Sequence, residues 1–219
     1  MIGANGPNSL IWWDWVGRHT HDIRLATFEH LRLTVLAVVI GLAISLVLAG
    51  VSLRWRRLYT PLAGFAGLLY TIPSLALFAI LLPITGFNTL TAEIGLVSYT
   101  LAIFMRNIVE GVDGVSPAVS DAADGMGYTT LRKLATVELP LALPAIIAGL
   151  RIATVTTVGL VTVTGLIGQG GYGSFINAGL GRTFSTEIMV GGGLSVVMAV
   201  VLDLVLIGVE RLATPWVPR

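Results

Sequence analysis

The 219-residue sequence has no cysteine, three histidines and few charged residues. A chain without cysteine forms no disulfide, holds no metal through sulfur and attacks no substrate with a thiolate. The histidines, His19, His21 and His30, all precede residue 31, which excludes a histidine-ligated catalytic metal in the rest of the chain. We therefore expect no catalytic constellation, no metal site and no cofactor bound by this chain.

Charge is scarce, because Lys, Arg, Asp and Glu make up 11% of the residues, whereas soluble globular chains carry about 25%. Hydrophobic residues make up 55%, and the mean hydropathy is +0.87. Such a chain has too little polar surface to face water on all sides, so it belongs in a lipid bilayer. The formal charge of +1 gives no basic face for a nucleic-acid partner.

Long uncharged runs mark the stretches that can cross a membrane, since a spanning helix needs about 20 mostly apolar residues. The second and third stretches form a hairpin around a polar turn at 85–88. The sequence therefore predicts an all-α, polytopic membrane bundle with five transmembrane helices in one domain at 31–209. The expected spans are about 31–53, 61–84, 89–109, 141–167 and 189–209.

The distribution of basic residues predicts the orientation of these spans, since loops rich in Lys and Arg face the cytoplasm. Arg54, Arg56 and Arg57 directly follow the first span and place that loop inside. The same scheme puts the long polar stretch 110–140 in the cytoplasm and leaves the turn at Gly86, which has no Lys or Arg, outside. An odd number of spans then places the N-terminus outside and a tail at 210–219 in the cytoplasm.

The N-terminal segment 1–30 lacks the pattern of a cleavable signal peptide, so we expect it to remain part of the mature protein. The predicted orientation places this segment on the extracytoplasmic side. Trp12, Trp13 and Trp15 are typical of an aromatic belt at a membrane interface. Two readings remain open: an amphipathic piece lying on the outer surface, or a loosely ordered tail.

The stretch 110–140 carries the most informative pattern. Ser120 or Asp121 can cap a short helix there, and Gly125 and Gly127 can stop it and turn the chain. Glycine at 127 permits a left-handed turn. A compact knob on the cytoplasmic face would follow, either seated in a groove of a partner protein or packed against its own bundle.

A second amphipathic helix is expected after the turn. Leu131, Leu134 and Val137 recur every three residues and form an apolar stripe, while Arg132 faces elsewhere. Pro140 is expected to end this helix and start the fourth span.

This stretch resembles the coupling loop of permeases of ATP-binding cassette (ABC) importers, which has a Glu-Ala-Ala, Gly and Ile-x-Leu-Pro signature. Asp replaces Glu and Val replaces Ile in this sequence, and both changes are conservative. The matching residues are Asp121-Ala122-Ala123, Gly127, Val137 and Leu139-Pro140, at the spacing of the signature.

Further segments resemble the osmoprotectant subgroup of this family, whose members carry glycine betaine, carnitine, choline or proline betaine. The resemblance covers about residues 29–180. Its segments include 70–77, 105–107, 125–127, 139–144, 149–154 and 166–168.

The resemblance implies a multi-pass protein of a prokaryotic plasma membrane that works with several partners. These would be two cytoplasmic ATPase subunits that hold ATP and Mg²⁺, a second permease subunit and an extracytoplasmic substrate-binding protein. The second permease could be identical or a related chain, and we lean slightly to a related one. No Walker glycine loop is present, so we expect ATP hydrolysis in a separate chain.

Pro73 lies in the middle of the second expected span, where a missing N–H opens the helical ladder. A kink there would place Tyr70 and Ser74 at the translocation path or a gate, with plain helix packing as the alternative. On the outer side, the glycine-rich stretch 168–173 predicts a tight turn, and 174–180 a short segment at an outer gate or facing the binding protein.

Arg151 and Asp203 are the charges that lie deepest in the expected spans. Unpaired charges in a membrane are costly, so a structural ion pair is expected, with Arg106 as a competing partner for Asp203. A substrate site is the alternative reading.

Two rival functions stay open. One keeps the ABC importer and changes the cargo to an amino acid, a sulfonate or another small solute. The other is a secondary transporter or channel driven by ions, which would favour inverted repeats or several intramembrane acids.

Overall fold

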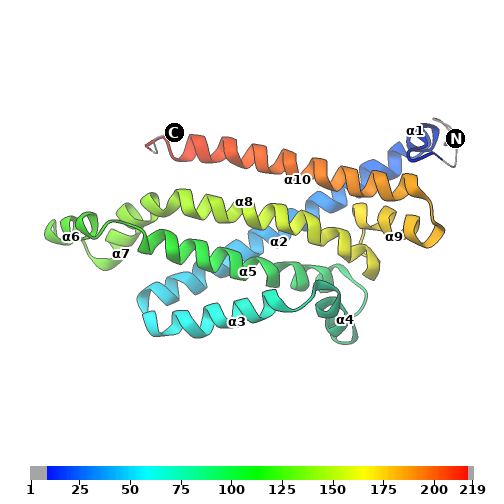
Figure 1. The fold of residues 1–219 in the computed structure, drawn as a ribbon. Coiled ribbons are helices and arrows are strands. Elements are labelled where there is room, and N and C mark those ends of the chain that lie inside the picture. The colour runs from blue at the N-terminus through cyan, green and yellow to red at the C-terminus, as the bar shows by residue number, and fades with distance from the viewer. Residues whose placement is uncertain (1–8, 217–219) are drawn as a thin grey trace.

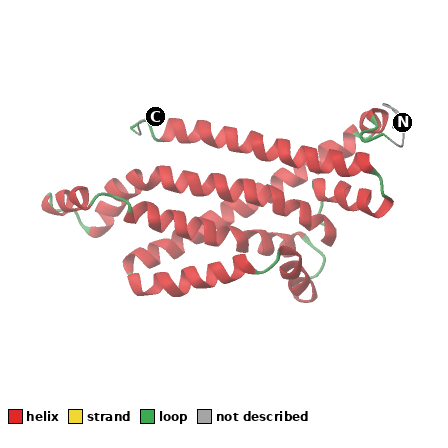
Figure 2. Ribbon diagram, viewed as in Figure 1, coloured by secondary structure: helices red, strands yellow, loops and turns green. Residues whose placement is uncertain are grey.

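The computed structural model describes residues 9–216, and within them the regular structure is helical throughout, with no strand (Figure 2). This confirms the predicted all-α class. The helical elements are α1 (Trp13–Arg18), α2 (Thr20–Arg54), η1 (Arg56–Leu58), α3 (Tyr59–Thr71), α4 (Ser74–Thr85), α5 (Thr89–Asp113), α6 (Pro117–Gly125), α7 (Thr130–Lys133), η2 (Leu134–Glu138), α8 (Leu139–Thr164), η3 (Gly165–Ile167), α9 (Tyr172–Arg182) and α10 (Ser185–Ala213).

The long helices run side by side, with α10, α8, α5 and α3 stacked in this order in Figure 1 and α2 crossing behind them. The short helices α6 and α7 project at one end of the bundle, beside the C-terminal end of α10. The short helices α1 and α9 lie at the opposite end. The bundle thus has two distinct ends, each built around a loop between long helices.

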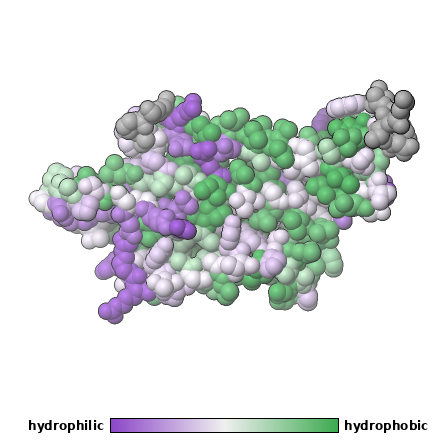
Figure 3. Space-filling model, viewed as in Figure 1, coloured by the Kyte–Doolittle hydropathy of each residue, from purple (hydrophilic) through white to green (hydrophobic). Residues whose placement is uncertain are grey.

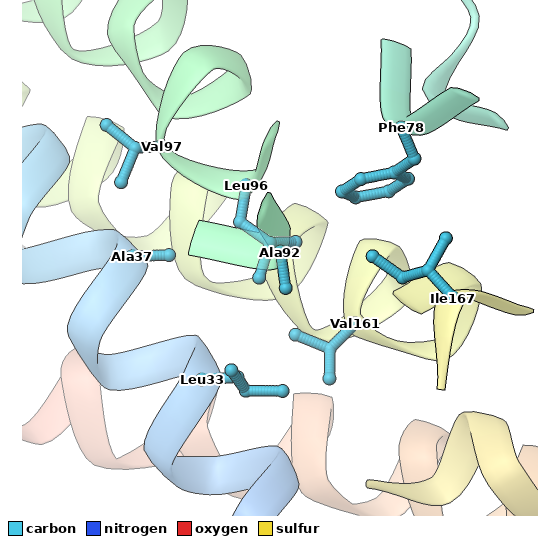
Figure 4. Packing of buried hydrophobic residues seen from close by; sticks show 8 residues of the cluster. All are labelled: Leu33, Ala37, Phe78, Ala92, Leu96, Val97, Val161 and Ile167. Atoms are coloured by element: carbon cyan, nitrogen blue, oxygen red, sulfur yellow. The ribbon is translucent and has the colours of Figure 1, made fainter. Parts of the chain in front are cut away.

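Small and branched apolar residues fill the centre where α2, α4, α5 and α8 meet. Phe78 points from α4 toward Ile167, and Leu96 and Ala92 lie between α2 and α8 (Figure 4). A Cβ at Gly95 would collide with the ring of Phe78, so glycine there allows α4 to approach α5.

By length and composition, α2, α5, α8 with its preceding turns, and α10 can each cross a membrane. The pair η1–α3 and α4 also qualifies when taken together, although it is bent by 97°. The exposed surface of α10 is strongly apolar, as a lipid-facing helix requires. Figure 3 shows hydrophobic residues gathered toward the end with α4 and α9 and hydrophilic residues gathered toward the end with α6 and α7.

The span predicted at 61–84 is two helices instead of one kinked helix. Ile72 and Pro73 have extended backbone with ψ of 127° and 131°, since a proline disfavours helical geometry in the residue before it. The hydroxyl of Tyr99 on α5 donates to the carbonyl of Ile72, which satisfies an acceptor that the break leaves free. A stable break, and not a mild kink, is the result.

The first long helix, α2, begins at Thr20 and not near residue 31, so part of the predicted N-terminal segment belongs to the bundle. His30 is fully buried, and its two ring nitrogens contact the backbone of Val158 (3.0 Å) and Tyr172 (3.2 Å). These bonds let a polar residue enter the core, so neither a surface helix nor a loose tail describes residues 20–30.

The last helix continues to Ala213, beyond the predicted end at 209, so the predicted tail begins inside it. Residues 1–8 of the predicted N-terminal segment and residues 217–219 of the predicted tail lie outside the described residues.

Candidate functional site

The projecting end of the bundle is built from α6, α7 and η2, which together occupy most of the stretch 110–140. Helix α6 begins at Pro117, after Ser116, because proline suits the first turn of a helix. Asp121 therefore lies inside α6, and the expectation that Ser120 or Asp121 caps the helix is wrong. Asp121 and Ala122 are exposed, whereas Ala123 is fully buried.

The turn after α6 is a Schellman motif, in which two backbone N–H groups close the end of a helix. The N–H of Gly127 donates to the carbonyl of Asp124 (2.9 Å), and that of Tyr128 donates to Ala123 (3.1 Å). Gly127 has φ of +78°, in the left-handed region where a side chain is strained. Gly125 is the last residue of α6.

The chain from Thr130 to Thr164 is then helical without a gap, through α7, η2 and α8. Pro140 lies in the first turn of α8 and does not end the preceding helix as predicted. Pro140 has no N–H to donate to a helical hydrogen bond. The π-helical turn Leu134–Glu138 directly before it has a wider hydrogen-bonding pattern than an α-helix, which accommodates the missing donor. The projecting end is thus rigidly continuous with a long helix of the bundle.

Polar contacts tie α6 to the helix that follows. Lys133 Nζ donates to Asp124 Oδ2 (2.8 Å), and the hydroxyl of Ser120 donates to Glu138 Oε1 (3.2 Å). The guanidinium of Arg132 lies over the ring of Tyr128, 4.3 Å from its centroid. Two short helices are therefore held as one unit.

Two large apolar side chains are exposed on this unit among charged and polar ones. Leu131 is 77% exposed and Met126 is 67% exposed, while Leu134, Val137, Leu139 and Pro140 are half-buried. The predicted stripe is therefore divided between the bundle and the surface. Met126 was missed in the sequence because a lone methionine between glycines follows no helical period. Such a surface suits docking into a groove of a partner protein.

Tyr70, Pro73 and Ser74 lie together at the break between α3 and α4. Tyr70 is 44% exposed, and its ring packs edge-on against that of Tyr99, with centroids 5.8 Å apart. Ser74 is the first residue of α4. The break therefore presents a polar and aromatic group at one place on the bundle.

Arg151 on α8 binds two acidic residues on α10. Its Nε and Nη2 contact the two carboxylate oxygens of Asp203 (2.8 and 3.2 Å), and Nη1 contacts Glu210 Oε2 (3.2 Å). Arg106 instead pairs with Glu110 on its own helix (2.8 Å) and does not reach Asp203. Glu210 was missed because it lies at the edge of the expected span, one heptad after Asp203.

In the part of the chain that the structure describes, no cluster of three or more His, Cys, Asp or Glu side chains is arranged to hold a metal ion.

Comparison with known proteins decides the family. Residues 27–218 match the family described as the binding-protein-dependent transport system inner membrane component. The chain belongs to this family. It is a permease subunit of an ABC importer in the inner membrane, as the coupling-loop signature predicted.

The permease is 34% identical over 195 residues to the choline transport system permease protein OpuBB of Bacillus subtilis (strain 168), with 89% of each chain covered. It is equally similar, at 34% over 195 residues and 89% of each chain, to the glycine betaine/carnitine/choline transport system permease protein OpuCB of the same organism. The osmoprotectant import permease protein OsmW of Salmonella typhimurium strain LT2 is 34% identical over 194 residues, which cover 86% of this chain and 90% of that protein. The predicted resemblance to the osmoprotectant subgroup is confirmed.

Solved structures share the fold. An inward-facing structure of the MetNI methionine ABC transporter has a chain with a TM-score of 0.78 at 20% identity, covering 88% of this permease and 96% of that chain. A crystal structure of an amino acid ABC transporter with histidines gives 0.77 at 19% identity, covering 90% and 96%.

Proposed function

We propose that this permease imports a quaternary-ammonium osmoprotectant such as glycine betaine, choline, carnitine or proline betaine. The observation that carries the substrate class is the 34% identity, over most of both chains, to permeases named for choline and for glycine betaine, carnitine and choline. The fold neighbours, at 20% identity or less, give no information about cargo.

Five spans with the N-terminus outside and the C-terminus in the cytoplasm follow if the bent pair α3–α4 counts as one broken span. Arg54, Arg56 and Arg57 lie exposed at the end of α2 nearest to the projecting unit, which supports a cytoplasmic position for both. The end with α1 and α9 then faces outward.

The projecting unit 110–140 is the surface on which an ATPase subunit docks in this proposal. Its Schellman turn, its internal ion pair and the unbroken helical run into α8 make it a lever instead of a flexible loop. Closure of two ATPase subunits around ATP and Mg²⁺ would push the lever, and α8 would pass the movement to the bundle. A gate near Tyr70, Pro73 and Ser74 would respond by a change at the existing break.

The ion pair between Arg151 and Asp203, extended by Glu210, braces α8 against α10 so that the push reaches both helices. Two permease subunits, identical or related, and an extracytoplasmic binding protein would complete the transporter.

Uptake of labelled choline and glycine betaine tests the proposal in cells that lack other uptake systems for these solutes. We expect uptake that needs this chain, is lost when cellular ATP is depleted and is competed by quaternary ammonium solutes. Uptake that survives ATP depletion would overturn the ATP-driven mechanism. Competition by amino acids and not by betaines would overturn the substrate class.

Leu131→Asp examines the docking surface in the same cells. We expect at least about tenfold lower uptake with unchanged amounts of permease in the membrane, because a charge in place of an exposed apolar side chain opposes burial against the partner. Leu212→Asp, on an equally exposed leucine at the end of α10, is the matched control. Equal losses in both variants would mean that this position has no special role.

A further inference from the structure

A pocket of about 460 Å³ opens at the end of the bundle opposite the projecting unit, between α1, the start of α2, α9 and the start of α10. Its volume falls within the range of about 300–1,000 Å³ that is typical of small-molecule sites. The helix break, the ion pair on α8 and the projecting unit lie elsewhere, so the pocket belongs to none of the sites described above.

Acidic side chains dominate the charge of this pocket. Asp22, Glu29 and Glu187 line it, against a lone guanidinium from Arg182. Arg182 is already paired with Glu187 Oε1 at 2.9 Å, so the remaining formal charge comes from Asp22 and Glu29. A net negative pocket attracts a cation.

Glu187 provides a second and independent sign of a missing partner. Its side chain is 5% exposed, and its Oε2 atom has no hydrogen-bond partner among the described residues. A buried carboxylate oxygen without a partner is costly, and a positive ligand near it lowers that cost. Asp22, in the first turn of α2, also has no ion-pair partner within the described part of the chain.

The rest of the lining is mainly apolar and aromatic, with His19, which stacks on Trp15 at 4.1 Å between ring centroids, and Ser174 as its polar members. Trp15 is buried and packs edge-on against Phe175, with centroids 6.0 Å apart, and Leu25 and Ala26 continue the wall. A metal ion would need converging oxygen ligands, and the described residues contain no such group. A quaternary ammonium has a delocalised charge and a shell of methyl groups, and it binds where carboxylates lie beside aromatic and apolar walls.

We propose that this pocket binds an organic cation of the quaternary-ammonium class at the outer end of the permease, with Asp22, Glu29 and Glu187 facing the charge and Trp15 and Phe175 forming the wall. The identity of the solute rests on the proposed function, whereas the charge and shape of the site rest on the pocket itself. The net charge favours choline, which is a cation, over the zwitterion glycine betaine.

Direct binding tests the proposal on the membrane complex in lipid nanodiscs, prepared without the extracytoplasmic binding protein. Choline is titrated by calorimetry, beside glycine betaine and 3,3-dimethyl-1-butanol, the neutral carbon analogue of choline. We expect saturable choline binding, and at least about tenfold weaker binding of the neutral analogue, a difference of about 1.4 kcal/mol. No saturable choline binding, or equal binding of the neutral analogue, would overturn the proposal.

The decisive variant is Asp22→Asn, because this exposed side chain has no partner among the described residues and its loss should leave the fold intact. We expect about fivefold to tenfold weaker choline binding. Asp14→Asn is the matched control, because Asp14 lies on the adjacent α1 but outside the pocket. Equal weakening in both variants would mean that diffuse surface charge, and not the pocket, attracts choline, which also overturns the proposal.

Uptake by the full transporter separates this inference from the proposed function. If the complex imports no quaternary ammonium solute but Asp22→Asn still weakens choline binding, the proposed function fails and the pocket stands. If uptake is normal and choline does not bind to the complex, the pocket fails and the proposed function stands.

Discussion

The two ends of the permease are held together in different ways. At the projecting end, the contacts join residues close in sequence: Lys133 binds Asp124 nine positions away, and Ser120 binds Glu138 eighteen positions away. At the opposite end, Glu29 and His30 bind the backbone of Gly171 and Tyr172, each 142 positions away. One end is a locally folded unit, and the other is assembled from distant parts of the chain.

This difference bears on the proposed function. A unit that carries force between two proteins, as proposed for the projecting end, needs its own internal rigidity, which a Schellman turn and a short ion pair supply. The opposite end instead closes the bundle, because α2, α8 and α9 are joined there through buried polar contacts. Damage at the opposite end should unfold the permease, whereas damage at the projecting end should leave it folded and uncoupled.

The largest expected effect is that of His30→Leu at the end opposite the projecting unit. Leucine has a volume similar to that of histidine but cannot bond the N–H of Tyr172 or the carbonyl of Val158. Losing these two bonds in the core costs about 2–4 kcal/mol. The unfolding temperature of the purified complex in nanodiscs measures the loss. His21→Leu, on the same helix and exposed, is the control. Equal stability of the two variants would contradict the role of the buried histidine.

Gly173→Ala should rank next. A Cβ there would collide with the backbone carbonyl of Thr162, which cannot swing aside as a side chain can, so a cost of about 1–3 kcal/mol is expected. Gly181→Ala is the matched control on α9, where an added Cβ meets nothing within 4 Å. The amount of folded permease after heating compares the two. A Gly173→Ala protein as stable as Gly181→Ala would show that α9 and α8 can separate without loss.

At the projecting end, Gly127→Ala places a side chain at φ of +78°, with an expected cost of about 1–2 kcal/mol that is confined to the turn. We expect little change in global unfolding and a clear loss of transport-coupled ATP hydrolysis. Gly125→Ala, in the same turn with helical backbone and open space for a Cβ, is the control. Global unfolding as large as that of His30→Leu would break the distinction between the two ends.

The smallest effect on stability is expected for Lys133→Met. The Lys133 side chain is 16% exposed and methionine can keep the packing of its stem, while its partner Asp124 is 55% exposed, and pairs open to solvent contribute about 0–1 kcal/mol. The unfolding temperature should hardly change, and the rate of coupled ATP hydrolysis should fall modestly. Arg106→Met removes another exposed ion pair outside the lever and serves as the control. If coupled ATP hydrolysis falls more for Arg106→Met than for Lys133→Met, the ion pair of the projecting unit has no special role and α5 matters more for coupling.

The sequence predicted the local parts of this protein well and the distant parts poorly. The motif from Asp121 to Pro140 was recognised because its residues stand at the spacing of a family signature, which is a local feature of the sequence. The pairing of Arg151 with Asp203 was predicted, since an unpaired charge deep in a membrane is costly and an ion pair lowers that cost. The membership of Glu210 in that network and the burial of His30 required knowledge of which helices touch.

Errors in the predicted boundaries have the same cause. Pro140 was expected to end a helix and lies within a continuous helical run, because a π-helical turn absorbs its missing donor. Pro73 was expected to kink a helix, and the chain breaks by 97° instead, because Tyr99 from α5 satisfies a carbonyl at the break. In each case proline set the local constraint and its neighbours decided the outcome.

The sequence by itself determined that the chain is an all-helical membrane protein, since hydropathy and charge placement act over short stretches, and the spacing of residues 121–140 matched a family signature. Only the tertiary structure decided how α3 and α4 diverge, which residues brace α8 against α10, and that carboxylates from α2 and α10 meet beside aromatic rings from α1 and α9. These features depend on contacts between residues far apart in the chain, and no local pattern specifies such contacts.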